Sequence, residues 1–325
     1  MAAACALAAA TLIPLSRDAG TAISGGELTA GSTRAAPATT GDCSSPEASL
    51  PASGGDGPNI DAIKDRGHLI VGVDQNSYRW GYRDPATDRI TGFDIDLARA
   101  IADDLLGEVE EGGKDNIVFR AVPTNQRIPA LNNGTVDIVV RTMTINCDRI
   151  KQVAFSTAYF QAGQQILAPR QSDITGWDGT LKGKRVCSAE GSTAYDELRK
   201  NTFGAVFKDP GDGGPADEDI LTVPNQLDCL VRLQQGLVDA VLTDNALAAG
   251  HAAQDPAVEL KGDGPFTTEY YGVATKLGKD DLVGRINRVL EEYRQSGWKT
   301  SYDKWLKSGP AEKTPEPPAP KYRSG

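Results

Sequence analysis

The sequence has few of the residues that metal sites and nucleic-acid surfaces require. Its only two histidines, His68 and His251, are too few and too far apart for a metal site. None of its five cysteines forms a Cys-x-x-Cys pair, the spacing typical of zinc ligands. Acidic residues outnumber basic ones by 44 to 34, and no segment clusters Lys and Arg. We therefore expect no metal, no cofactor and no nucleic-acid partner.

The sequence also lacks an apolar run of the roughly 20 residues that span a bilayer. Residues 1–16 carry no charged side chain and resemble the apolar region of an export signal, although the usual basic leader is missing. We assign residues 1–24 to a signal or anchor segment and interpret Cys5 as a small residue within it rather than as a lipid-attachment site. The protein is expected outside the cytoplasm, in the cell envelope, with membrane anchorage left open.

What the sequence does contain is typical of a folded protein, with 39% hydrophobic and 24% charged residues. Once Cys5 is assigned to the signal, an even number of cysteines remains, which in an exported chain favours two disulfides. Four cysteines allow three pairings. These cysteines are Cys43, Cys147, Cys187 and Cys229.

Two segments rich in small residues and proline flank the part of the chain expected to fold. We predict a flexible tether over residues 25–58 and a disordered tail over residues 309–325. Between them, short apolar runs alternate with amphipathic helical patterns, which is the rhythm of βαβ units. The clearest predicted strands are 69–73, 117–122 and 136–140, and the clearest helices are 280–296 and 298–307.

An internal repeat supports two lobes of like architecture. The segment 131–140, with Gly134 and Asp137, returns 102 residues later as 233–242, with Gly236 and Asp239. Each copy predicts a helix that ends at glycine and a buried strand that begins after aspartate.

Four segments carry recognisable motifs, namely 67–74, 90–98, 142–149 followed by 155–160, and 238–244. Together they resemble the polar amino-acid-binding members of bacterial extracellular solute-binding protein family 3. The segment Arg141-Thr-Met-Thr-Ile-Asn-Cys-Asp-Arg149 is most similar to actinobacterial glutamate- or glutamine-binding members. The resemblance covers roughly residues 60–307 and implies a type II periplasmic-binding-protein-like α/β fold, with two lobes joined by two hinge strands around a ligand cleft.

The resemblance assigns ligand-binding roles to residues of both lobes. Arg149 matches the guanidinium that grips the ligand α-carboxylate, for which its planar fork of donors is suited. Thr142 and Thr144 would add hydroxyl and backbone N–H donors. Asp244 matches the position that binds the α-ammonium group, although it is also placed to cap the following helix.

Two further groups of residues belong to the expected cleft. Ser192 and Thr193 lie in a turn that would offer donors to the carboxylate, and Ser192 alone also fits a helix N-cap. Asp74, Tyr78 and Trp80 follow the first strand, where the family places an aromatic side chain over the ligand. Which of the two aromatic residues has this role is left open.

Specificity for the ligand side chain is less defined by the sequence. A second carboxylate on the ligand would need its own cation, for which Arg79, Arg127 and Arg141 are candidates. Arg141 interrupts an apolar strand end, and its alternative role is a salt bridge to Asp94 or Asp96. Glutamate, glutamine, aspartate and asparagine all remain candidate ligands.

The resemblance also gives boundaries and a disulfide pairing. It implies residues 59–161 and 268–308 for lobe 1 and residues 162–267 for lobe 2. This division favours Cys187–Cys229 within lobe 2 and Cys43–Cys147 on the lobe 1 side, because a bridge between lobes would oppose hinge closure.

The function expected from the resemblance is binding without chemistry. The protein would be a monomer that captures a small polar amino acid and delivers it to a membrane ABC permease or a membrane sensor. The alternative is a prephenate- or arogenate-type dehydratase on the same fold, for which Glu190 is the candidate general acid.

Overall fold

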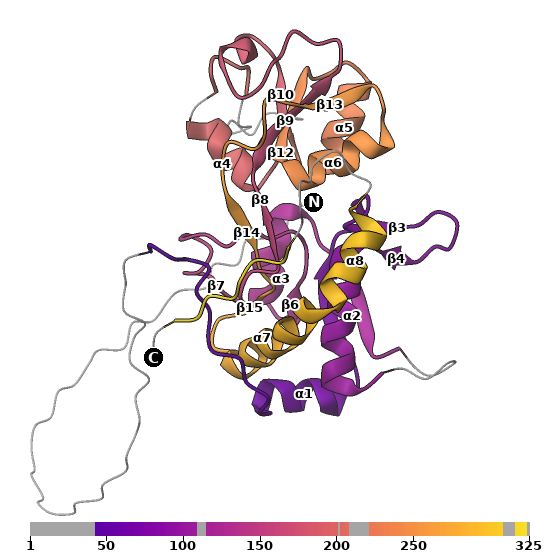
Figure 1. Ribbon diagram of the computed structural model, residues 1–325, viewed down its shortest axis with the longest axis vertical. Helices are drawn as coiled ribbons and strands as arrows, with labels where there is room; N and C mark the ends of the chain where they lie inside the picture. The colour runs from indigo at the N-terminus through magenta and orange to yellow at the C-terminus, as the bar shows by residue number, and fades with distance from the viewer. Residues whose placement is uncertain (1–42, 109–114, 201, 208–220, 308–315, 324–325) are drawn as a thin grey trace, which may run out of the picture. The chain divides into compact units, whose positions relative to one another are not determined.

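Two five-stranded sheets organise the chain in the computed structural model (Figure 1), which describes residues 43–108, 115–200, 202–207, 221–307 and 316–323. In the first sheet, β1 runs parallel to both of its neighbours, whereas β15 runs antiparallel to its own. The strand order is β5 (Ile117–Ala121), β1 (Leu69–Val73), β6 (Ile138–Val139), β15 (Ala274–Lys276) and β7 (Val153–Phe155).

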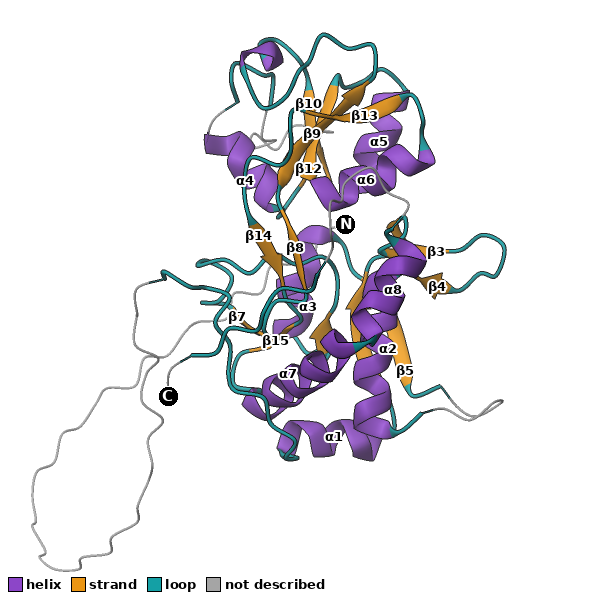
Figure 2. Ribbon diagram, in the orientation of Figure 1, coloured by secondary structure: helices purple, strands orange, loops and turns teal. Residues whose placement is uncertain are grey.

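Five α-helices accompany this first sheet (Figure 2). The longest, α7 (Asp280–Gln295), buries Leu282, Ile286 and Leu290, which recur at helical spacing and so lie on one face. The others are α1 (Pro58–Arg66), α2 (Phe93–Leu106), α3 (Arg127–Asn132) and α8 (Gly297–Trp305), together with the 3-10 turn η1 (Thr124–Gln126). A small three-stranded sheet is formed by β2 (Asn76–Ser77), β3 (Gly81–Arg83) and β4 (Ile90–Thr91).

The second sheet repeats the parallel arrangement at its centre. Strand β10 pairs in parallel with β11 and β12, and β9 then runs antiparallel to β12 and β13. The strand order is β11 (Thr222–Val223), β10 (Val186–Ala189), β12 (Ala240–Asp244), β9 (Gln164–Pro169) and β13 (Val258–Lys261). The helices of this lobe are α4 (Thr193–Lys200), α5 (Gln226–Gln234) and α6 (Asn245–Gln254), with the 3-10 turn η2 (Gly179–Leu181).

Two short antiparallel strands connect the sheets along the chain. Strand β8 (Phe160–Ala162) leads from β7 to β9, and β14 (Glu269–Tyr271) leads from β13 to β15. The chain therefore has the two-lobed α/β architecture with two hinge strands that was predicted.

The internal repeat occupies corresponding places in the two lobes. Gly134 and Gly236 both adopt positive φ, at 76° and 69°, which lets the chain leave a helix in a conformation that other residues rarely adopt. The aspartate that follows each glycine accepts a backbone N–H from the neighbouring parallel strand: Asp137 from Ile70, and Asp239 from Arg185. Each aspartate thus fixes its central strand to the strand beside it.

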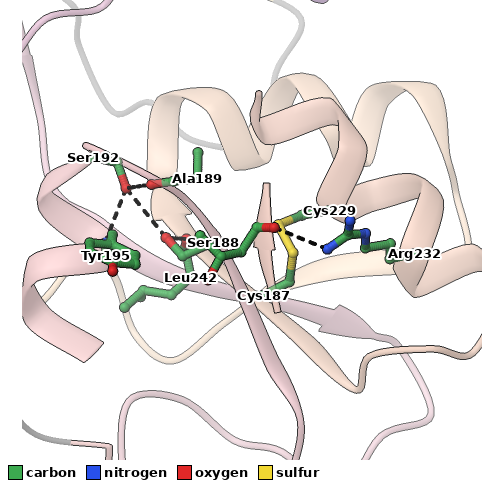
Figure 3. Close-up of a disulfide and its surroundings, with 9 residues drawn as sticks. Cys187, Ser188, Ala189, Ser192, Tyr195, Cys229, Arg232 and Leu242 are labelled. Carbon is green, nitrogen blue, oxygen red and sulfur yellow. Dashed lines mark hydrogen bonds between the residues drawn. A yellow bond between two sulfur atoms is a disulfide. The ribbon is translucent and has the colours of Figure 1, made fainter. Parts of the chain in front are cut away.

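Both disulfides have the expected pairing. Cys187 of β10 bonds to Cys229 of α5 (Figure 3), and both residues are fully buried in the core of lobe 2. Cys43 bonds to Cys147, only two residues before Arg149. Each bridge therefore joins segments that are far apart in the chain.

The expected tether and tail need correction where the structure describes them. Ser49 is buried and donates its hydroxyl to Phe155 O at 2.6 Å, and Ser53 N donates to Gly284 O at 2.9 Å. Ser49 also pairs with the C-terminal segment, because its N–H donates to Lys321 O at 3.0 Å and its carbonyl accepts from Arg323 N at 2.8 Å. Residues 43–57 and 316–323 are thus held by the body of lobe 1. Residues 25–42 and 309–315 lie outside the described residues.

No helix within the described ranges is long and apolar enough to cross a membrane. The longest helix, α7, has 16 residues and carries acidic and basic side chains along its length.

His251 gives the fold a dependence on pH. It is 1% exposed on α6, and neither ring nitrogen makes a hydrogen bond within the described part of the chain. Burial lowers the pKa of His251 from 6.5 to about 4. The unfolded chain therefore takes up a proton near pH 6.5, whereas the folded chain resists protonation until about pH 4, so stability falls as the pH drops between these values.

We expect the variant His251→Leu to lose this part of the pH dependence. Across the pH interval between the unfolded and folded pKa values, His251 lowers the free energy of unfolding by about 3 kcal/mol as the pH falls. Urea unfolding at several pH values measures it, with His68→Leu as the control because His68 is the only other histidine and is half-buried. Equal slopes of stability against pH in wild type and His251→Leu would contradict this account.

Candidate functional site

Two buried guanidinium groups meet at one backbone carbonyl. Arg149, in the loop between β6 and β7, donates to Gly191 O at 3.0 Å and to Thr144 O at 2.7 Å. Arg127 of α3 donates to the same Gly191 O at 3.1 Å and to Thr124 O at 2.8 Å. Neither arginine forms an ion pair with a carboxylate among the described residues. We call Arg127 and Arg149 the guanidinium pair.

Burial has a clear electrostatic effect on the guanidinium pair. Burial lowers the pKa of Arg149 and, more strongly, the pKa of Arg127. The neighbouring positive charges of Arg149 and Arg141 lower the pKa of Arg127 further. Two buried positive charges that hold only neutral carbonyls form a natural anion site, because guanidinium groups match a carboxylate in geometry and charge.

A cavity of about 280 Å³ opens beside the guanidinium pair. Its wall combines residues of α3 and the turn before it with residues at the start of α4. Asn125 Nδ2 donates to Glu190 Oε2 at 2.6 Å across this boundary, and Thr124 N donates to Pro224 O at 3.0 Å. The two lobes therefore contact each other here. The acidic lining residues Glu190 and Asp196 also lie at the cavity, and burial raises the pKa of Asp196.

The opposite charge collects at the hinge. Asp244 ends β12 and is 7% exposed; Glu269 begins the hinge strand β14 and is 8% exposed. Both carboxylates accept from Nε2 of Gln164, Glu269 at 2.8 Å, and Asp244 also accepts from the hydroxyl of Tyr271. We call Asp244, Glu269, Gln164, Tyr271 and Thr193 the acid cluster.

Two threonines connect the lobes through Glu269. Thr144 Oγ1 donates to Glu269 Oε2 at 2.6 Å and Thr193 Oγ1 donates to the same atom at 2.8 Å. The carbonyl of Thr144 also accepts a hydrogen bond from Arg149. This one residue therefore contacts both the acid cluster and the guanidinium pair. A small zwitterion has both of its charges matched by this arrangement.

Asp74 and Arg141 form a buried ion pair. Arg141 is fully buried, donates from Nη2 to Asp74 Oδ2 at 2.8 Å and also donates to Thr124 Oγ1 at 3.0 Å and Asn225 Oδ1 at 3.2 Å. The expected alternative salt bridge of Arg141 to Asp94 or Asp96 is therefore wrong.

The two aspartates proposed as partners of Arg141 have other donors. Asp94 accepts from Thr142 N and from the Tyr159 hydroxyl, both at 2.9 Å, and burial raises its pKa to about 7. Asp96 accepts from Ser301 and Trp305 on α8. Sequence spacing could not distinguish these partners, because Asp74 lies 67 residues from Arg141.

The two candidate aromatic residues differ in their surroundings. Trp80 is 1% exposed and packs edge-on against Phe93, Phe160 and Tyr271, while its Nε1 donates to Ala246 O at 3.1 Å. Trp80 is thus a core residue beneath the acid cluster. Tyr78 is half-buried and packs edge-on against Tyr82. Neither lines the cavity at the guanidinium pair.

The remaining candidates have mixed roles. Ser192 caps α4, since its Oγ accepts from Tyr195 N at 3.0 Å (Figure 3). Thr142 has a positive φ of 40° and uses its N–H on Asp94, whereas Thr193 belongs to the acid cluster. Asp244 precedes α6, but its side chain makes no capping hydrogen bond there.

Sequence reasoning missed Glu269, Gln164 and Tyr271. The polar pair Gln164-Gln165 begins the otherwise apolar strand β9, and Glu269 directly precedes two tyrosines. These were the available signals. Arg127 was considered only as a partner for the ligand side chain.

Comparisons with known proteins show which proteins this chain resembles. The sequence profile described as bacterial extracellular solute-binding proteins, family 3, matches residues 69–308. The ABC transporter glutamine-binding protein GlnH of Bacillus subtilis (strain 168) is 36% identical over 252 residues, which cover 77% of this chain and 85% of that protein.

Solved structures of similar proteins have the same fold. An ancestral arginine-binding protein bound to glutamine is 35% identical, with a TM-score of 0.63 and coverage of 74% of this chain and 98% of that one. The ancestral amino acid-binding protein AncCDT-1, a precursor of cyclohexadienyl dehydratase, is 29% identical, with a TM-score of 0.65 and coverage of 77% and 100%.

Proposed function

Because the chain belongs to family 3 of the bacterial extracellular solute-binding proteins, we propose that it binds a polar amino acid as a zwitterion. The α-carboxylate binds at Arg149 and the α-ammonium group at Asp244. The observation that carries this proposal is the burial of this guanidinium and this carboxylate, neither of which makes an ion pair with a described side chain. Each buried charge is costly alone, and a zwitterion between them compensates both.

Neighbouring groups support the two charged contacts. Thr142 and Thr144 contribute backbone and hydroxyl groups from lobe 1, and Ser192 and Thr193 contribute the start of α4 from lobe 2. Since α4 begins two residues after Gly191, a carboxylate at the guanidinium pair would also lie near the positive end of the helix dipole.

The ligand side chain is proposed to be an uncharged amide, with glutamine preferred over glutamate. Asp74 already neutralises Arg141, so this pair offers no free positive charge to a second carboxylate. Asn225 and Thr124 beside it are polar and uncharged, which suits an amide. The similarity to GlnH and to a structure with bound glutamine supports the same preference.

The protein is proposed to act outside the cytoplasm as a monomer that presents its ligand to a membrane ABC permease or sensor. The dehydratase alternative is less supported, because its candidate acid Glu190 is exposed and held by Asn125. The similarity to AncCDT-1 keeps prephenate in the test below.

A thermal-shift screen of the full chain against the twenty amino acids and prephenate tests the proposal. A ligand at 100 times its dissociation constant stabilises the fold by about 2.7 kcal/mol. We expect glutamine to give the largest shift, followed by glutamate or asparagine. No shift with any amino acid would refute the proposal, and a shift with prephenate alone would favour the dehydratase.

A further inference from the structure

The side chains of the acid cluster have more hydrogen-bond acceptor atoms than hydrogens that they can donate. Nε2 of Gln164 carries two hydrogens but lies within reach of three acceptors: Glu269 Oε1 at 2.8 Å, Thr193 Oγ1 at 2.9 Å and Asp244 Oδ1. The hydroxyls of Thr144 and Thr193 are both already directed at Glu269 Oε2. A ligand that brings additional hydrogen-bond donors would therefore be stabilised at the acid cluster.

A second observation concerns the other end of the same amide. Oε1 of Gln164 is buried, the residue is 0% exposed, and this oxygen has no hydrogen-bond partner among the described residues. A buried carbonyl oxygen without a donor destabilises the structure that holds it. It lies on the side chain whose nitrogen contacts both carboxylates, so the orphaned oxygen belongs to the acid cluster.

The third observation is charge. Within the described residues, no Lys, Arg or His forms an ion pair with Asp244 or Glu269, although both carboxylates are more than nine-tenths buried. The acid cluster therefore lacks a positive charge and further N–H donors. A primary ammonium group supplies both.

We propose that Glu269 and Gln164 complete the ammonium subsite of Asp244, and that ammonium binding expels one proton held at Asp244. This inference rests on the proposed function and adds two residues and a proton to it. The ammonium donates to Asp244, to Glu269 and to Gln164 Oε1. The displaced proton passes to the solvent buffer.

The electrostatics of the pair support proton release. Burial and the neighbouring Glu269 carboxylate raise the pKa of Asp244 to about 7. The titratable groups that face the pair are Tyr271 of β14 and the cations Arg149 and Arg127, which do not contact the carboxylates. A bound ammonium stabilises both ionised carboxylates and so lowers this pKa.

The direction of the pH dependence follows. Below about pH 7 the free site holds the extra proton and binding must release it, whereas well above pH 7 it does not. Affinity therefore rises by about tenfold between pH 6 and pH 8 and then levels off.

The position of the two added residues also couples the ammonium to both hinge strands. Glu269 begins β14, and Gln164 follows β8 after one intervening glycine. Glu269 is also contacted from lobe 1 by Thr144 and from lobe 2 by Thr193. An ammonium bound here is thus held where the chain crosses between lobes, which makes discrimination between an amino acid and its deaminated analogue a property of Glu269 as well as Asp244.

Isothermal titration calorimetry of the full chain with glutamine tests the proposal. Titrations in two buffers of different ionisation enthalpy count protons. We expect close to one proton released at pH 6 and close to none at pH 8.5 for wild type. Glu269→Gln should bind glutamine at least about tenfold more weakly at pH 8, because one charge-assisted hydrogen bond is lost. It should also release fewer protons at pH 6, because the negative charge that helps to raise the pKa of Asp244 is removed.

The control variant is Glu259→Gln on β13, which makes the same chemical change where the side chain is 35% exposed and bound to Lys261. It should match wild type in affinity and proton count. If wild type binds glutamine without proton release at pH 6, or Glu269→Gln matches wild type in both readouts, the inference is overturned while the proposed function stands. If wild type binds no amino acid, both fall. The wild-type proton count does not depend on whether Glu269→Gln folds.

Discussion

Arg149→Ala is expected to reduce the affinity for the amino acid by about a thousandfold. A buried, bidentate guanidinium–carboxylate contact that loses one partner costs about 2–5 kcal/mol, and the ligand carboxylate would then be left without its donor. Arg149→Lys keeps the charge but not the planar fork, so it should fall between wild type and Arg149→Ala. Calorimetric titration of the three proteins measures the order.

The control for this series is Arg185→Ala. Arg185 carries the same side-chain group as Arg149, but its side chain is 42% exposed and paired with Asp239 at the protein surface. Its loss should leave ligand affinity unchanged. Unchanged affinity of the Arg149→Ala variant would remove Arg149 from the carboxylate-binding role.

Removal of the Cys187–Cys229 bridge is expected to lower the free energy of unfolding by about 4 kcal/mol. The bridge spans a sequence separation of 42, and closing a loop of this size restricts the unfolded chain by roughly that amount. The Cys187→Ala/Cys229→Ala double variant avoids burying two free thiols. Guanidinium chloride unfolding of the double variant and wild type gives the difference.

The second bridge offers a comparison within the same protein. The Cys43→Ala/Cys147→Ala pair removes a bridge of separation 104, and its removal also frees the segment that Ser49 holds against Phe155. We expect a loss of stability at least as large. A change below about 1 kcal/mol in both double variants would contradict the view that these bridges constrain the unfolded chain.

The elements with the clearest hydrophobic spacing were predictable from the sequence. The predicted strand over 69–73 is β1 itself, the strand over 117–122 is β5 within one residue, and the helix over 280–296 is α7 within one residue. These segments have a strong period and clear breaks at their ends. The strand over 136–140 was predicted too long, because only Ile138–Val139 pairs with β1 in ladder geometry.

The terminal segments could not be predicted because their contacts are not periodic. Ser49 and Tyr322 meet in one isolated bridge, and the residues between 43 and 57 are fixed by single hydrogen bonds and one disulfide. Such contacts leave no pattern of apolar residues. The predicted bridge between Cys43 and Cys147 was nevertheless inconsistent with a free tether up to residue 58. It was the one feature of the sequence that indicated ordered structure in this segment.

The sequence named some members of the two buried clusters but not the residues that contact them. Arg149, Thr144 and Asp244 were found by their motifs, whereas Glu269 comes from a strand 25 residues beyond Asp244 and Gln164 from one 80 residues before it. Only the fold brings these three side chains together. The partner of Arg141 was misassigned for the same reason, since three aspartates in lobe 1 were equally compatible with its charge.

Calorimetric titration of the wild-type full chain with glutamine and two analogues tests the central claim most directly. Glutaramic acid is glutamine without the α-amino group, and 4-aminobutanamide is glutamine without the α-carboxylate. The account predicts saturable binding of one glutamine per chain and at least about a hundredfold weaker binding of each analogue, because each leaves one buried charge uncompensated. Binding of either analogue with the affinity of glutamine would contradict a site built to hold a zwitterion between Arg149 and Asp244.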